Sequence, residues 1–119
     1  MKLFIVVLLS GIFLFSCKKE TETDPEVEPV PAAISFTTDI QPIFQQSCGT
    51  GNSCHGSVHS VDGKVYETHA GASAVPSSTT MGAIKHESGF SNMPQGGSKL
   101  TDTKIAIIQA WIDGGKLND

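Results

Sequence analysis

The sequence contains no arginine, and its eight basic residues, all lysines, are outnumbered by twelve acidic residues. Without a basic patch, the chain lacks the electrostatic footprint of a protein that binds nucleic acid. It also has no Ser–His–Asp array, no paired-carboxylate site and no phosphate-binding loop, which are patterns that carry common enzymatic chemistries. We therefore expect neither nucleic-acid binding nor enzymatic activity.

A long apolar run is also missing, because the longest one, residues 3–15, falls short of the about 20 residues that cross a bilayer. Preceded by Lys2, this run has the form of a signal-peptide core. It ends in a Leu-Phe-Ser-Cys stretch that closes at Cys17 and resembles the lipobox of bacterial lipoproteins. The resemblance implies that residues 1–16 are a signal peptide and that Cys17 is lipidated. An ordinary cleaved signal peptide or a membrane anchor is the alternative.

The segment that follows is rich in acid and proline. Residues 18–31 hold five acids, two lysines and three prolines, with almost nothing to bury. Such a composition favours an extended, disordered chain. We interpret residues 17–33 as the lipidated N-terminus with a tether, and residues 34–119 as the folded domain. The domain would then be held at a bacterial membrane in the cell envelope, on the periplasmic or outer-surface side.

Cysteine is scarce, and its few positions carry most of the chemical information. With Cys17 assigned to lipid, Cys48 and Cys54 remain as a pair, and His55 follows directly, which gives the pattern C-x5-C-H. Covalent attachment of haem uses two thiols that add to the porphyrin vinyl groups, with the next histidine as a ligand of the iron. The usual spacing is C-x-x-C-H. Here the spacer is longer, and its two glycines would let the loop bulge.

A haem iron that carries electrons normally has a second protein ligand, and Met93 is the best candidate. Pro94 keeps this methionine out of a helix, and the glycines that follow allow a loop to approach a flat ring. A thioether is a soft ligand suited to iron. Met93 could instead fill the core, a common role of methionine. The other candidates are Met81, His59, His69 and His86, and we expect His69 and His86 at the surface.

The domain is predicted to begin and end with amphipathic helices. The first spans residues 39–47, with Asp39 as the N-cap. The last spans residues 102–113, with Thr101 as the N-cap, an apolar face that includes Trp111, and two glycines that stop it. The middle is irregular, with short helices expected at residues 65–70 and 81–86.

Taken together and in order, these features resemble a small class I c-type cytochrome of the kind found in exported bacterial proteins. The resemblance covers nearly all of residues 34–116. The matching stretches are Ile-Gln-Pro-Ile-Phe (40–44), Cys-x5-Cys-His-Gly (48–56), Tyr66, Met-Pro with glycines (93–97) and Trp-Ile-Asp-Gly-Gly (111–115).

The resemblance implies an all-α fold around one covalently bound haem c. Cys48 and Cys54 would form the thioether links, with His55 as the proximal and Met93 as the distal iron ligand. The first and last helices would pack across each other beside the haem. The residues expected at that crossing are Ile43, Phe44, Ile108 and Trp111. The implied function is single-electron transfer by a membrane-tethered monomer, in exchange with redox partner proteins of the cell envelope.

The same residues are also compatible with other functions. The chain could be a haem-free binding or adhesion lipoprotein in which Cys48 and Cys54 form a disulfide. A metal site of Cys48, Cys54 and His55 is disfavoured because adjacent residues are awkward joint ligands of one tetrahedral ion, and no second C-x-x-C or H-x3-H pair completes a set. A haem gas sensor or peroxidase would require an open sixth position on the iron.

Overall fold

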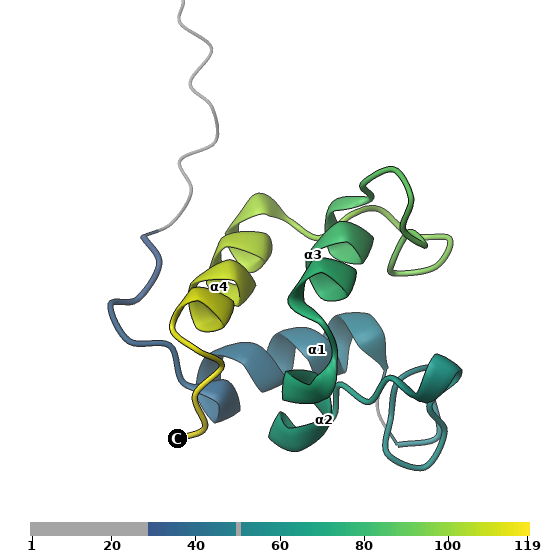
Figure 1. The fold of residues 1–119 in the computed structure, drawn as a ribbon, viewed down its shortest axis with the longest axis horizontal. Coiled ribbons are helices and arrows are strands. Elements are labelled where there is room, and N and C mark those ends of the chain that lie inside the picture. Colours follow the sequence, from purple (N-terminus) through teal and green to yellow (C-terminus); the bar gives the residue numbers. More distant parts are fainter. Residues whose placement is uncertain (1–28, 50) are drawn as a thin grey trace, which may run out of the picture.

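The computed structural model describes residues 29–49 and 51–119 (Figure 1). The predicted signal peptide, the lipidation site at Cys17 and most of the tether lie outside these residues. The described part is all-helical, as predicted, and its one β-bridge joins His55 to Ser60. Its elements are the π-helix η1 (Phe36–Ile40), α1 (Gln41–Cys48), the 3-10 helix η2 (Val61–Gly63), α2 (His69–Ala74), α3 (Ser77–Lys85) and α4 (Asp102–Asp113).

The first helix starts earlier than residue 39, so the prediction that Asp39 is its N-cap is wrong. The cap is Ser35, whose hydroxyl accepts from the Thr38 N–H at 3.1 Å. Asp39 reaches back, and its carboxylate accepts from the Ser35 N–H at 2.8 Å, a reciprocal arrangement like a capping box. Pro42 has no N–H to bond the carbonyl four residues earlier, and it lies in the first turn of α1, just after the wider π turn of η1.

The two short helices of the middle are displaced from their predicted positions. Residues 65–68 are not helical, and α2 begins only at His69, because the Thr68 hydroxyl caps it by accepting from the Gly71 N–H at 3.2 Å. Helix α3 is longer than predicted at its start, where it follows Pro76. It ends one residue early, because His86 adopts a left-handed conformation with φ of 59°.

Helix α4 confirms its prediction at both ends. The Thr101 hydroxyl accepts from the Lys104 N–H at 3.3 Å, and the helix ends at Asp113, with Gly115 at φ of +90° just beyond. The Trp111 side chain is 3% exposed, and its indole N–H donates to the Leu117 carbonyl at 3.0 Å. Local caps and an apolar face together determine this helix.

The core forms where α4 packs against α3 and against the start of the first helix (Figure 1). All four residues expected at the helix crossing are buried: Ile43, Phe44, Ile108 and Trp111. The N-terminal helix meets α4 mainly through η1, where the rings of Phe36 and Trp111 lie 5.6 Å apart, closer than the 6.3 Å between Phe44 and Trp111. Phe36 lies before the predicted helix, which is why the sequence pattern did not include it.

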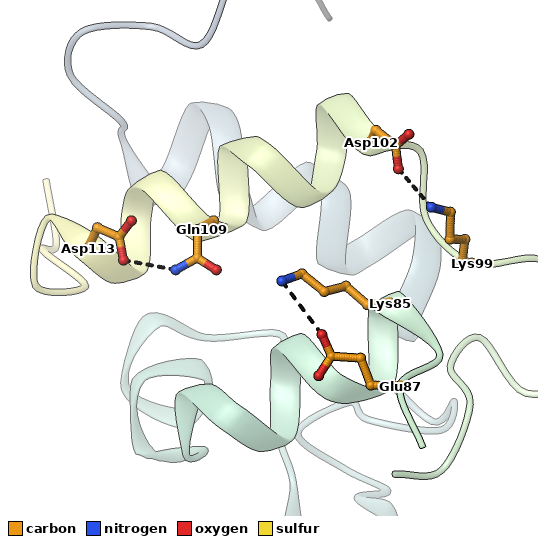
Figure 2. Close-up of polar contacts among 6 residues, drawn as sticks. All are labelled: Lys85, Glu87, Lys99, Asp102, Gln109 and Asp113. Carbon is orange, nitrogen blue, oxygen red and sulfur yellow. Dashed lines mark hydrogen bonds and ion pairs between the residues drawn. The ribbon is translucent and has the colours of Figure 1, made fainter. Parts of the chain in front are cut away.

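Exposed polar contacts lie on the surface around α3 and α4. Figure 2 shows three of them: Lys85 with Glu87 after α3, Lys99 with Asp102 at the start of α4, and Gln109 with Asp113 along α4. Exposed pairs of this kind contribute little to stability. They lie at the end of α3, at the start of α4 and along α4.

Candidate functional site

A cavity of about 350 Å³ lies beside the core. Its walls come from the end of α1, the loop after it, residues 61–66, α3 and the loop at residues 90–95. Helix α4 contributes none of its described lining, although the resemblance placed this helix beside the haem. The volume lies at the lower end of the range typical of small-molecule sites.

The cavity gathers the four residues that the sequence analysis singled out for haem. Cys48 is the last residue of α1, Cys54 and His55 follow in the next loop, and Met93 comes from the loop after α3. All four line the same cavity, although Met93 is far from the others in the sequence.

The long spacer between the cysteines folds back on itself. Gly49 has φ of +79°, and a Cβ there would lie 2.9 Å from the Ser53 Cβ, so the loop passes too close for another residue. The His55 N–H then donates to the Cys48 carbonyl at 3.2 Å. The second half of the C-x5-C-H motif therefore returns to the end of α1, where Cys48 lies.

His55 is held in one tautomer. The side chain is 6% exposed, and its Nδ1 lies 3.0 Å from the Lys64 carbonyl oxygen. A carbonyl can only accept, so Nδ1 carries a proton, and Nε2 is the nitrogen that this bond leaves free. A histidine that donates through one nitrogen and binds through the other is the usual arrangement of a metal ligand. The His55 carbonyl also accepts from the Tyr66 N–H at 2.9 Å, which fixes the backbone of the loop.

Met93 is fixed on both sides of its backbone. Its N–H donates to the Ala83 carbonyl at 3.0 Å, and its carbonyl accepts from Nε2 of His86 at 3.1 Å. The end of α3 therefore determines where the Met93 side chain enters the cavity.

The other proposed sixth ligands lie outside the lining of the cavity. Met81 is buried in the core, and His59 is exposed. His69 and His86, which we expected at the surface, are both half-buried. His69 bonds the Lys116 carbonyl at 2.7 Å and packs edge-on against the rings of Phe36 and Trp111.

The sequence analysis missed the wall that α3 provides. The Thr80 hydroxyl and the Tyr66 hydroxyl form a buried hydrogen bond of 2.8 Å. On the same helix, Gly82 has no side chain and the Phe90 ring lies directly over it, 2.3 Å from where a Cβ would be. A glycine in a helix interior costs stability relative to alanine, so Gly82 was the available signal of a close approach.

The environment of the cavity keeps its inner thiol neutral. Burial raises the pKa of Cys48 from 9.0 to about 12, and the neighbouring Cys54 adds to the rise. Both cysteines are free thiols, with Cys48 half-buried and Cys54 exposed. Burial also raises the pKa of Tyr66. Cys48 and Tyr66 therefore line the cavity as uncharged groups at neutral pH.

Comparison of the chain with protein-family models, with curated proteins and with solved structures found no match. In the part of the chain that the structure covers, no three His, Cys, Asp or Glu side chains are grouped to hold a metal ion. None of the helices described is long and apolar enough to span a membrane.

The residues that line the cavity fit a haem c. Two thiols could form thioether bonds, and an imidazole with a free Nε2 and a thioether sulfur could both bind the iron. Ala83, Ile84 and Phe90 give the cavity apolar surface of the kind a porphyrin face requires.

Proposed function

We propose that the chain is a membrane-tethered mono-haem c-type cytochrome with a class I-like fold, acting in single-electron transfer. The observation that carries this proposal is the convergence of Cys48, Cys54, His55 and Met93 on one cavity. Cys48, Cys54 and His55 come from one motif and Met93 from a distant part of the sequence, so their shared location supports the assignment.

Each residue has a defined role in the proposal. Cys48 and Cys54 would hold the haem by thioether bonds, each formed when S–H adds across a vinyl group with no leaving group and no net oxidation. His55 would bind the iron through Nε2, while the Lys64 carbonyl holds the proton on Nδ1. The haem supplies a one-electron iron couple, and histidine–methionine ligation raises its potential. Ala83 and Ile84 of α3 would place apolar side chains against the haem.

A visible spectrum of the full chain, co-expressed with a haem-attachment system, tests the proposal. We expect a sharp α-band on reduction and a haem-stained band on a denaturing gel, because thioether-linked haem survives denaturation. A colourless protein with a Cys48–Cys54 disulfide would contradict the proposal and would support the haem-free binding lipoprotein.

The sixth ligand is tested by two matched methionine variants. Met93→Leu removes the sulfur of a residue that lines the cavity, whereas Met81→Leu removes one from the buried core, and both keep the side-chain volume nearly unchanged. We expect only Met93→Leu to abolish the weak long-wavelength band of the oxidised protein. Loss of that band in Met81→Leu alone, or in neither variant, would exclude Met93 as the ligand.

The lipid anchor is tested separately with Cys17→Ser. We expect the unmodified chain in the membrane fraction after cell lysis and the variant in the soluble envelope fraction or left unprocessed. Equal distribution of both proteins would argue against lipidation at Cys17.

A further inference from the structure

We infer that Glu67 is a positioning residue that holds the long spacer of the C-x5-C-H motif, so that Cys48 and Cys54 reach one haem. The inference rests on the proposed function and extends it to a residue for which the sequence pattern gave no signal.

The two carboxylate oxygens of Glu67 bind two different parts of the loop. Oε1 accepts from the Gly51 N–H at 3.3 Å, and Oε2 accepts from the Ser57 N–H at 2.6 Å. These two amides lie on either side of Cys54 and His55 in the sequence. One side chain therefore fixes the loop before and after the residues that would bind haem.

The backbone of Glu67 is in turn tied to α1, the helix that carries Cys48. Its carbonyl accepts from Nε2 of Gln41 at 3.0 Å. Glu67 thus connects the helix of the first cysteine with the loop of the second. The link sets the position of Cys54 relative to Cys48 independently of the spacer.

The length of the spacer explains why such a link is needed. A spacer of two residues leaves the second thiol few positions, whereas five residues with two glycines have more conformations to lose. Hydrogen bonds from Ser57, with a smaller contribution from Gly51, also lower the pKa of Glu67, so its carboxylate is ionised at neutral pH and presents two acceptors.

The test compares Glu67→Gln with Glu87→Gln in the full chain. A glutamine at residue 67 has one acceptor oxygen and one amide group, and that amide group would face a backbone N–H. Glu87→Gln makes the same chemical change at an exposed residue whose contact is with Lys85 (Figure 2). Circular dichroism checks that both variants keep the helical content of the unmodified chain. Glu67→Asp provides a second variant at this position, whose carboxylate is too short to reach both the Gly51 and the Ser57 amides.

Two readouts are measured. The first is the share of haem-bearing chains that still carry a free thiol, counted by mass after alkylation under denaturing conditions. The second is hydrogen–deuterium exchange of peptides covering residues 49–58 in the chain produced without haem. For Glu67→Gln we expect a rise of about fivefold in both, with the new free thiol at Cys48, because hydrogen bonds to a charged acceptor are among the stronger ones. We expect no change for Glu87→Gln.

The outcomes separate this inference from the proposed function. Complete double attachment in Glu67→Gln would overturn the positioning role, whether or not exchange rises. If hydrogen–deuterium exchange of residues 49–58 were the same in Glu67→Gln as in the unmodified chain, Glu67 would not hold this loop. If the unmodified chain took up no haem, the proposed function would fail and the role in attachment with it, while the exchange measurement would still decide whether Glu67 holds the loop.

Discussion

The half of the domain built on α4 and the half that surrounds the cavity are held together in different ways. Around Trp111 the chain is regular and buried, with caps supplied by residues adjacent to each helix. Around the cavity the chain is irregular, and its loops are fixed by hydrogen bonds between residues 7 to 26 positions apart, which belong to different elements. The first half supplies stability, and the second half places chemical groups.

This difference has a consequence for substitutions. A change near α4 should act on the free energy of unfolding, because it removes buried apolar contact. A change near the cavity should act on reactivity or on cofactor attachment, because many of the groups there are partly exposed. Measurements that separate the two effects test whether the division is real.

The largest effect is expected for Trp111→Ala, which should lower the free energy of unfolding by about 3–5 kcal/mol. The ring contacts Phe36 and Phe44 from η1 and α1, so its removal opens a cavity between α4 and the N-terminal helix. Chemical denaturation gives the value. Leu117→Ala, at an exposed side chain, is the control, because it keeps the backbone carbonyl that accepts from the indole. A loss below about 1 kcal/mol for Trp111→Ala would show that α4 is not the main source of stability.

The next effect concerns the two thiols of the chain produced without haem. Cys48 should react with an alkylating reagent at pH 8 on the order of a hundredfold more slowly than Cys54. The thiolate is the reactive form, and a pKa of about 12 leaves almost none of it on Cys48 at that pH. Cys54 is exposed and accessible. The rates follow from mass spectrometry of peptides sampled over time, and equal rates would show that the inner wall of the cavity is open to solvent.

A smaller effect is expected for Gly82→Ala, and its sign should depend on Phe90. With the phenylalanine present, the added methyl group meets the ring and should destabilise the domain by about 1–3 kcal/mol. With Phe90→Ala in the background, the same change should stabilise it by about 0.5–1 kcal/mol, the usual gain of alanine over glycine in a helix. Denaturation of the four chains of this cycle measures the coupling. Two effects of the same sign would mean that the ring does not lie over the helix.

The same division explains which features could be predicted from the sequence. Helix α4 was predicted at both ends because Thr101, its apolar face and the terminal glycines are local signals. The start of the first helix was not, because Asp39 and Ser35 are both capping residue types and the burial of Phe36 depends on tertiary packing with α4. Local propensity alone cannot decide between two such caps.

The candidate site also contains residues that could be predicted from local sequence and residues that could not. Cys48, Cys54 and His55 were predicted because the C-x5-C-H spacing resembles a known chemical pattern, and Met93 because of the proline and glycines that follow it. Glu67 and Phe90 could not be predicted. Their partners, the loop amides and Gly82, are identified only when the chain is folded, and a lone glutamate or phenylalanine has no characteristic spacing.

The smallest effect concerns Asp119, which joins the C-terminal end of the α4 half to the cap of the first helix. Its carboxylate accepts from the Ser35 hydroxyl and from the Thr37 N–H at 3.1 Å, and the bond from Ser35 is the main cause that lowers the pKa of Asp119 from its ordinary value of 3.8. A lowered pKa in the folded state means that the stabilisation is present above 3.8 and is lost as the pH falls through the folded value. Asp119→Asn should therefore lower the Tm slightly at pH 7, and the difference between the two chains should shrink as the pH falls below 3.8. A difference in Tm that is constant across this range would show that the charge on Asp119 plays no part in joining the two ends of the domain.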